Sequence, residues 1–403
     1  MESTRRGFLQ VAGLGAGGLG ASRLLADGDR QTSAAEAAGT TGTAGTAGTA
    51  GVVDFYGAHQ AGIATPAQLH LQFASLDLVG DSRAELRQLL RMWSDAAALM
   101  SLGQPVGPTS TGSKPPVDTG ESIGLPASDL TVTVGLGPTL FTRDGRDRLG
   151  LADRRPAPLV NLPSFAGDAL DPALCGGDLA IQVCANDPQV AFHAVHDLIR
   201  MAGPAAVPRW LLAGSGRTAN SRHQVVPRNL MGFKDGTANI MVENKSALDQ
   251  FVWASKPTSP AWMRGGSYLV ARRIQILLGA WDGTGLTSQQ RTIGREKLSG
   301  QVLANLPTDA HILLSAPVDN DGERILRRGY SYLDGIDPAT ESVAAGLMFL
   351  CYQRDPRQQF IPIQRRLAGA DALNRFIRHV GSAIFACPPG ISHGGFVGEG
   401  LLG

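Results

Sequence analysis

The chain has 403 residues, enough for two ordinary domains with sizeable cores, and its 36 basic and 35 acidic residues give a formal net charge of +1. No basic stripe with interleaved aromatic residues is present, so the composition argues against a nucleic-acid-binding protein. The cysteines are widely spaced and form no CxxC pair, which makes a zinc or iron–sulfur site unexpected. Because three of them lie in apolar runs, buried free thiols are expected among Cys175, Cys184, Cys351 and Cys387.

Residues 1–30 have the layout of a twin-arginine export signal. Arg5 and Arg6 precede a mildly apolar run rich in glycine and alanine, Val11–Leu25. Glycines would weaken a core helix here, and the run is too short for a membrane span. We expect export by the twin-arginine pathway to the periplasm, the cell surface or the medium, with no stable membrane span in the mature chain.

Residues 31–52 read as a flexible linker. The segment Gly39–Gly51 contains little besides glycine, threonine and alanine, which cannot bury enough apolar area to fold. The folded part is therefore expected to begin near Val53, with an N-terminal domain over 53–228 and a C-terminal domain over 229–403. His59, near the start, has no flanking partner residues and is predicted to be a loop residue.

The first half predicts the element order strand–helix–strand–strand–helix–strand, which is that of a ferredoxin-like unit. The predicted elements are a strand at Leu69–Leu76, an amphipathic helix at Arg83–Met100, strands at Leu130–Leu136 and Leu179–Cys184, a helix from Asp187-Pro188 to Met201, and a strand at Trp210–Ala213. Residues 101–128, rich in glycine, proline, serine and threonine, are expected to form a surface loop. His193 and His196 lie three residues apart on the second helix. Without a carboxylate or third ligand at a matching offset, they are predicted to be helix-surface residues.

The second half repeats this order of elements. It predicts a strand at Gly266–Leu278, a helix at Thr287–Leu298 capped by Thr287 or Ser288, a strand at Ala345–Tyr352, helices at Pro356–Arg366 and Ala370–His379, and a last strand at Ala383–Cys387. The expected fold class is α+β, with two ferredoxin-like units and antiparallel sheets.

Three segments of the second half carry reactive side chains. Asp235 lies between Gly232 and Gly236, where the backbone can turn tightly and approach a ligand. An Asp-Gly pair alone is an ordinary turn signal. The downstream His311, in Asp309–Leu314, and Arg327, in Ile325–Tyr330, change that interpretation. One carboxylate, one imidazole and one guanidinium are what a haem peroxidase needs on the two faces of its haem.

Together, Gly232–Asn239, His311 and Arg327–Tyr332 resemble the signature of the dye-decolourising peroxidases, and of their exported branch that includes periplasmic, iron-uptake-linked enzymes. The resemblance extends from about Gly57 to the C-terminus. It implies two ferredoxin-like halves packed sheet to sheet, of the dimeric α+β barrel type, with one haem b per chain. It also implies hydrogen peroxide and a small-molecule reductant as substrates, iron-uptake components as further partners, and a homo-oligomer.

His311 is the candidate axial ligand, because a neutral imidazole is the commonest protein ligand of haem iron. It lies where the polar turn Pro307–Asp309 meets an apolar run, although without the resemblance a hydrogen-bonded core histidine would be the better interpretation. A second partner for the imidazole is expected, but relatives often have a carboxylate where this chain has Asn374-Arg375, which leaves that partner open. By resemblance, the residues that line the haem on this side are Ala316, Pro317 and Val318.

On the other face, Asp235 is the candidate that moves a proton between the two oxygens of hydrogen peroxide. Arg327 would stabilise the charge on the departing oxygen and contact the haem, although a surface ion pair is the simpler interpretation of an arginine. Because Arg328 points the other way on a strand, at least one of the two is expected to face inward. By resemblance, backbone contacts to the haem come from Gly236, Thr237 and Ala238.

Electrons from bulky donors would reach the haem through aromatic side chains. Tyr332, Trp281 and Trp262 are candidate relays, although a packed aromatic is the simpler interpretation of each. Two alternative functions stay open: an exported haem-handling protein that releases iron from haem, and a haem-free binding protein on the same scaffold. The joint presence of Asp235, His311 and Arg327 argues against the second.

Overall fold

The computed structural model describes residues 51–109, 112–255, 257, 259–337 and 341–403. The predicted export signal and nearly all of the predicted linker lie outside these residues. Within the described ranges, no helix has both the length and the apolar character that crossing a membrane would need.

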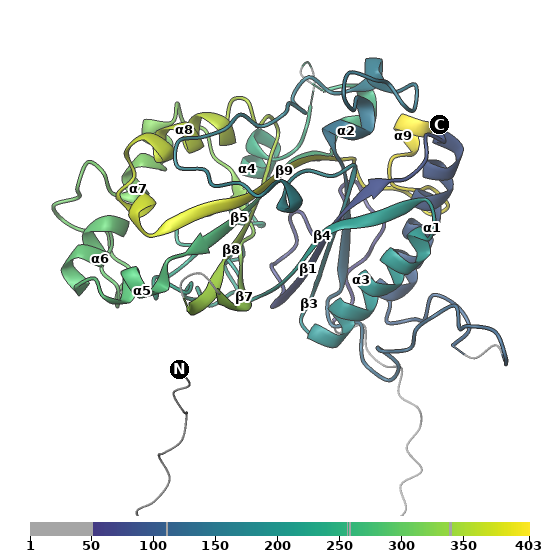
Figure 1. Cartoon of the computed structure of the whole chain (residues 1–403), viewed down its shortest axis with the longest axis horizontal. Helices are drawn as coiled ribbons and strands as arrows, with labels where there is room; N and C mark the ends of the chain where they lie inside the picture. Colours follow the sequence, from purple (N-terminus) through teal and green to yellow (C-terminus); the bar gives the residue numbers. More distant parts are fainter. Residues whose placement is uncertain (1–50, 110–111, 256, 258, 338–340) are drawn as a thin grey trace, which may run out of the picture. The chain divides into compact units, whose positions relative to one another are not determined.

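The first half forms a four-stranded antiparallel set in the order β2-β3-β1-β4, with α1 and α3 on one face (Figure 1). Ser82 starts α1 by accepting the N–H of Glu85, and Asp187 starts α3 by accepting the N–H groups of Gln189 and Val190. This is the ferredoxin-like order predicted from the sequence. The elements are β1 (His70–Leu78), α1 (Arg83–Ser101), β2 (Thr131–Leu136), α2 (Pro138–Phe141), β3 (Leu179–Ala185), α3 (Pro188–Ala202) and β4 (Ala206–Ser215), with 3-10 turns at Ala152–Arg154 and Pro172–Leu174.

The second half repeats the arrangement in the order β9-β5-β8-β7, and the short β6 also pairs with β8. Its strands are β5 (Ser267–Ile276), β6 (Leu326–Arg327), β7 (Tyr330–Asp337), β8 (Ser342–Gln353) and β9 (Ile377–Cys387). Its helices are α4 (Lys245–Phe251), α5 (Leu278–Asp282), α6 (Leu286–Ile293), α7 (His311–Leu314), α8 (Phe360–Ala370) and α9 (Glu399–Leu402), with 3-10 turns at Ala261–Met263, Pro317–Asp319 and Ala372–Arg375.

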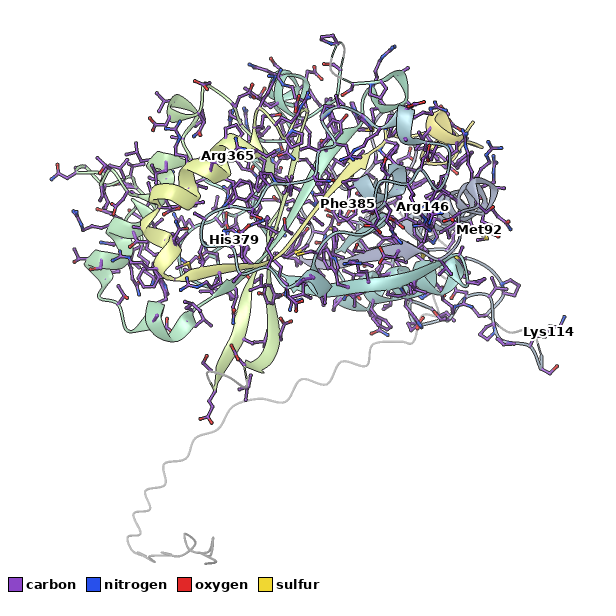
Figure 2. All side chains as sticks on the ribbon, turned by 45° about the horizontal axis from the view of Figure 1, so that its top comes forward. Met92, Lys114, Arg146, Arg365, His379 and Phe385 are labelled. Atoms are coloured by element: carbon purple, nitrogen blue, oxygen red, sulfur yellow. The ribbon has the colours of Figure 1, made fainter. Side chains whose placement is uncertain are left out.

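The two sets of strands join into one closed barrel. At one seam β4 pairs with β7 through Ser215 and Ser331, and at the other β2 pairs with β9 through Leu136 and Ala386. The expected α+β fold with antiparallel strands and a barrel is confirmed, and the hydrogen bonds that run continuously around the ring leave few free strand edges. Figure 2 shows side chains crowding the interior, with the fully buried Phe385 among them, whereas Lys114 projects from an outlying loop.

The predicted helix Ala370–His379 is wrong. Helix α8 ends at Ala370, and Asp371 then accepts the N–H of Leu373 and starts a separate 3-10 turn. From Ile377 onward the chain is the strand β9, with burial that alternates along its first residues. The polar residues Arg378 and His379 near the start of this strand hid its period of two.

Two other predicted helices have different bounds. Helix α6 begins at Leu286 after Gly285, so neither Thr287 nor Ser288 is the cap, and it ends at Ile293 before Gly294, which adopts a left-handed φ of +93°. Helix α8 begins at Phe360, later than predicted, because the Asp355 carboxylate accepts the backbone and side-chain N–H groups of Arg357 and holds the preceding residues in a turn.

Candidate active site

A cavity of about 480 Å³ opens in the C-terminal half, and every residue that lines it lies after position 228. This volume is within the range of small-molecule and cofactor sites. The walls are mainly apolar, with side chains such as Ile274, Ile293, Leu306 and Leu367, and a few polar groups converge on them. These polar groups form two sets, one around His311 and one around Asp235.

His311 is the first residue of α7 and lines the cavity. Its Nδ1 lies 2.6 Å from Oδ2 of Asp371, while Oδ1 of the same carboxylate accepts the N–H of Leu373 at 2.8 Å. Because both oxygens of the buried Asp371 are engaged, the carboxylate cannot rotate away from the imidazole. The proton therefore belongs on Nδ1, and the lone pair of Nε2 is left for a ligand in the cavity.

The electrostatics of this pair favour a strong imidazole donor. Burial lowers the pKa of His311, but the charge of Asp371 and its hydrogen bond outweigh burial, so the pKa lies above its ordinary value. The His311 side chain is 35% exposed, and that exposure is to the cavity it lines. A carboxylate behind a ligating imidazole raises the basicity of the ligand.

The second set consists of Asp235 and Arg327. Nη1 of Arg327 donates to Oδ1 of Asp235 over 2.8 Å, and both residues line the cavity. The Asp235 side chain is 10% exposed, and its backbone N–H donates to the carbonyl of Pro227 at 2.8 Å. A carboxylate and a partly exposed guanidinium are thus held side by side at the cavity wall.

Asn239 fixes the positions of Asp235 and Arg327 relative to each other. Its Oδ1 accepts the N–H of Arg327 at 2.9 Å, and its Nδ2 donates to the carbonyl oxygens of Arg327 at 2.8 Å and Ala219 at 3.0 Å. The buried amide therefore fixes β6 to the loop that carries Asp235. Asn239 closes the Gly232–Asn239 motif, and its role was not predicted from the sequence.

The loop itself depends on Gly236. Its φ is +110°, and a Cβ at this position would lie 2.6 Å from the carbonyl oxygen of Ala219 and 2.7 Å from its nitrogen. A residue with a side chain could adopt this φ and avoid contact with Ala219 only if the backbone shifted. The tight turn expected here is confirmed, and the close approach observed is to the backbone of Ala219.

The cavity brings together most of the residues predicted for the site. Arg328 points away from it, lies fully buried in the barrel and donates from Nη1 to the carbonyl of Thr65 at 2.7 Å, so both neighbouring arginines face inward. Val318 does not line the cavity, because the 3-10 turn Pro317–Asp319 leaves its side chain 83% exposed. Predicted residues that do line it are Asp235, Gly236, Thr237, Ala238, His311, Ala316, Pro317 and Arg327.

Other sequence predictions concern histidines and aromatic residues. His59 stacks on Trp253 at 3.7 Å and its Nδ1 is 2.6 Å from the carbonyl of Gly265, which is a structural loop role. The prediction that His193 is a surface residue is wrong: it is 2% exposed, and Asp197 follows it by four residues on the same face. The candidate relays are all buried among other side chains: Tyr332, Trp281 and Trp262.

Asp371 was missed by sequence reasoning. It lies three residues before Asn374, where a carboxylate was sought, and inside the stretch that was wrongly predicted to be helical. An Asp that precedes a short Ala-Leu-Asn segment is a turn-starting signal, and that signal was available in the sequence.

An imidazole supported by a carboxylate on one wall of an apolar cavity, with an Asp–Arg pair also at the wall, defines the class of haem enzymes that act on peroxide. Comparison with known families agrees. Residues 60–215 match the family model for the Dyp-type peroxidase N-terminal region, and residues 226–392 match that for its C-terminal region.

Individual relatives agree with the family models. The chain is 35% identical to the deferrochelatase of Escherichia coli (strain 536) over 86% of each chain, and 36% identical to that of Yersinia pseudotuberculosis over 84% of this chain and 82% of the relative. Ferric DtpA from Streptomyces lividans superposes with a TM-score of 0.79 at 38% identity, covering 88% of this chain and 98% of that one. A DyP-type peroxidase from Streptomyces coelicolor gives the same TM-score and identity over 87% and 97%. The chain belongs to the dye-decolourising peroxidase family and is a haem-dependent peroxidase.

Proposed function

We propose that this chain holds one haem b in the 480 Å³ cavity and uses hydrogen peroxide to oxidise dyes, phenolics or similar donors. The donor set fits the cofactor: Nε2 of His311 is the free imidazole nitrogen, and the remaining walls are largely apolar. Bound haem supplies iron that accepts the oxidising equivalents of peroxide and passes them to the donor. Cavity residues in reach of a porphyrin include Gly236, Thr237, Ala238, Ala316 and Pro317.

Asp235 and Arg327 act on the peroxide. The Asp235 carboxylate takes a proton from one peroxide oxygen and returns it to the other, which then leaves as water. Arg327, 2.8 Å from Asp235, stabilises the negative charge that develops on the departing oxygen. In total, hydrogen peroxide takes up two protons and two electrons and leaves as two water molecules, while two donor molecules lose one electron each.

The proposal depends on the pair of Asp235 and Arg327, and an assay of peroxide-dependent dye oxidation tests it. Arg327→Ala should lower kcat/KM for peroxide by about 10²–10³-fold with haem content unchanged. Asp235→Ala should lose less, because a water molecule can carry the proton in its place. Arg365→Ala, an exposed arginine on α8 (Figure 2), is the matched control and should behave as wild type. Wild-type turnover in both pocket variants would exclude these roles.

A second candidate function is release of iron from haem with the porphyrin left intact. It is favoured by the 35% identity to proteins named deferrochelatase. In this reaction the iron leaves and the porphyrin nitrogens take up two protons. Free porphyrin fluoresces whereas haem does not, so incubation of the loaded protein with a reductant should produce porphyrin fluorescence. A haem spectrum that stays constant without fluorescence would exclude the reaction.

We also propose that the chain is exported by the twin-arginine pathway, loaded with haem before it crosses the membrane. Arg5 and Arg6 with the run that follows support this, and changing both arginines to lysine should hold the protein in the cytoplasm. We further propose that the chain forms a homo-oligomer and acts with iron-uptake components. Its two domains would meet between residues 228 and 229. Light scattering of the purified protein tests the oligomer.

A further inference from the structure

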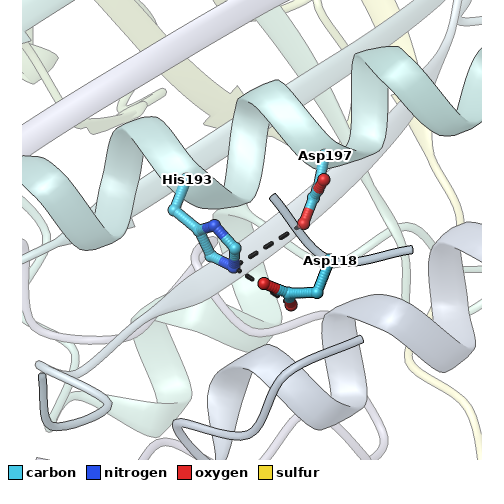
Figure 3. Close-up of side chains that lie close together, drawn as sticks. All are labelled: Asp118, His193 and Asp197. Atoms are coloured by element: carbon cyan, nitrogen blue, oxygen red, sulfur yellow. Dashed lines mark ion pairs between the residues drawn. The ribbon is translucent and has the colours of Figure 1, made fainter. Parts of the chain in front are cut away.

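Asp118, His193 and Asp197 meet in the first half of the chain, away from the cavity, which none of them lines. His193 and Asp197 lie on one face of α3, and Asp118 reaches them from the loop between α1 and β2 (Figure 3). Nε2 of His193 is 3.5 Å from Oδ2 of Asp118 and 3.7 Å from Oδ2 of Asp197. The side chains of Asp118, His193 and Asp197 are 1%, 2% and 0% exposed, so the cluster is shielded from water.

Two of the three facing atoms have no hydrogen-bond partner. Among the described residues, Nε2 of His193 and Oδ2 of Asp197 are both buried polar atoms left unpaired. Burying such atoms without a partner costs about 1–3 kcal/mol each, and more for a charged group. Two carboxylate oxygens and a ring nitrogen therefore converge on a point where a cation would be stabilised.

The surrounding contacts fix each group in the orientation of a metal ligand. Nδ1 of His193 is 2.9 Å from Oε2 of Glu121, which places the ring proton on Nδ1 and the lone pair of Nε2 toward the two aspartates. Oδ1 of Asp197 accepts from Arg200 at 2.9 Å and from Thr119 at 3.2 Å, so only its Oδ2 is free. Asp118 is also held in place, because its Oδ1 accepts the N–H of Gly120 and its Oδ2 accepts the N–H of Val106.

We propose that Asp118, His193 and Asp197 bind a divalent cation of the zinc class, which ties the loop between α1 and β2 to α3. A tetrahedral ion about 2.0–2.1 Å from each ligand separates its ligands by about 3.3–3.4 Å, close to the spacings of 3.5 and 3.7 Å found here. One imidazole with carboxylates suits zinc better than magnesium or calcium, which prefer oxygen ligands alone.

Charge supports a divalent ion over a proton. Across the ion pairs that His193 and Arg200 form, the carboxylates of Asp118, Asp197 and Glu121 meet one guanidinium, that of Arg200. A proton on His193 would offset half of the remaining negative charge, whereas a divalent cation offsets all of it. The site is separate from haem chemistry, so its role is to stabilise the N-terminal half.

Zinc retention by the purified, untagged holoprotein tests the proposal. After dialysis against a chelator, reloading with zinc chloride and desalting, wild type should retain about one zinc ion per chain, with haem iron measured in the same sample as reference. Asp197→Asn, which keeps the shape of the side chain, and His193→Gln should retain almost none. His196→Gln, on the same helix and also bonded to Glu121, is the matched control and should retain zinc as wild type does.

The unfolding midpoint of the wild type gives a second readout that does not depend on any variant. Chelation should lower it, zinc should restore it, and the same concentration of magnesium should leave it unchanged. The haem absorbance should stay constant throughout. Equal zinc retention by wild type and Asp197→Asn, loss of zinc in His196→Gln, or an unchanged midpoint would each overturn the site, and an equal effect of magnesium would overturn the zinc class.

Discussion

Asp371 sets the chemistry of His311 through two hydrogen bonds of one carboxylate. Its Oδ2 orients the imidazole at 2.6 Å, and its Oδ1 is held by the N–H of Leu373. A freely rotating carboxylate would share its time with water, but this one cannot. The same residue ends α8 and starts the next 3-10 turn, so the local fold and the ligand geometry have one cause.

Asp371→Asn should separate these two roles. Asparagine also caps helices, so the 3-10 turn should persist, whereas the amide removes the negative charge and the acceptor that faces Nδ1. We expect haem affinity to fall by about 10–100-fold and the iron reduction potential to rise, because the anion no longer stabilises ferric iron. Haem transfer to an acceptor protein and a redox titration measure both quantities. An unchanged potential would contradict the role given to Asp371.

Residue identities in the site were more predictable from the sequence than their partners. Asp235, His311 and Arg327 stand in recognisable motifs, and the cavity brings them together as expected. Asp371 and Asn239 act through contacts across 60 and 88 residues of chain, and no local pattern encodes such contacts. In the buried cluster around His193, Asp118 was missed for the same reason, whereas Asp197, four residues after His193 on α3, was a local signal that was overlooked.

At the scale of elements, the loop over residues 227–239 is held by backbone geometry. Gly236 lies against the backbone of Ala219, and Asn239 joins the loop to β6. Two segments distant in sequence are thus fixed relative to each other with little freedom to adjust. That rigidity places the Asp235 carboxylate beside Arg327.

Gly236→Ala should disturb the site without touching a catalytic side chain. The positive φ alone costs on the order of 1–3 kcal/mol for an L residue, and the clash with Ala219 adds to it. We expect lower stability and displaced Asp235, seen as a lower unfolding midpoint and reduced peroxidase turnover. Gly369→Ala is the control: this exposed glycine in α8 has open space around its Cβ position, so alanine should leave turnover unchanged and stabilise the helix slightly. Equal effects of the two substitutions would contradict this account of the loop.

The bounds of helices and strands differ in how well the local sequence pattern predicts them. The strongly periodic α1 and α3 were predicted within one or two residues, because capping residues mark their starts. β9 was cut short, since the polar residues Arg378 and His379 near its start were read as part of a helix. The short β6, two residues long, depends entirely on its pairing with β8 and could not be predicted.

At the scale of the whole molecule, closure of the barrel places one buried titratable group beside an ion pair. His379 on β9 is 8% exposed and lies beside Arg272, which pairs with Asp168 (Figure 2 labels His379). Burial first, and then the charge of Arg272, lower the pKa of His379 to about 4 from 6.5. The folded protein thus holds this imidazole neutral at physiological pH.

Stability should therefore fall in acid through this residue. The unfolded chain binds a proton at His379 below pH 6.5, whereas the folded chain resists it down to about pH 4, so the stabilising difference is complete above pH 6.5 and is lost as the pH falls toward 4. Between pH 7 and pH 4 the wild type should lose about 3 kcal/mol more unfolding free energy than His379→Gln. Denaturant titrations at the two pH values measure the difference. Parallel losses in both proteins would show that His379 does not titrate as described.

The central claim is that His311 binds haem iron in the cavity of the C-terminal half, and haem content per chain tests it most directly. Wild type and His223→Ala, in which an exposed histidine outside the cavity is changed, should each carry about one haem per chain by pyridine haemochrome assay. His311→Ala should lose most of its haem, and added imidazole should restore part of the binding. Full haem occupancy with an unchanged spectrum in His311→Ala, or a wild-type protein that stays colourless when haemin is supplied, would contradict the account.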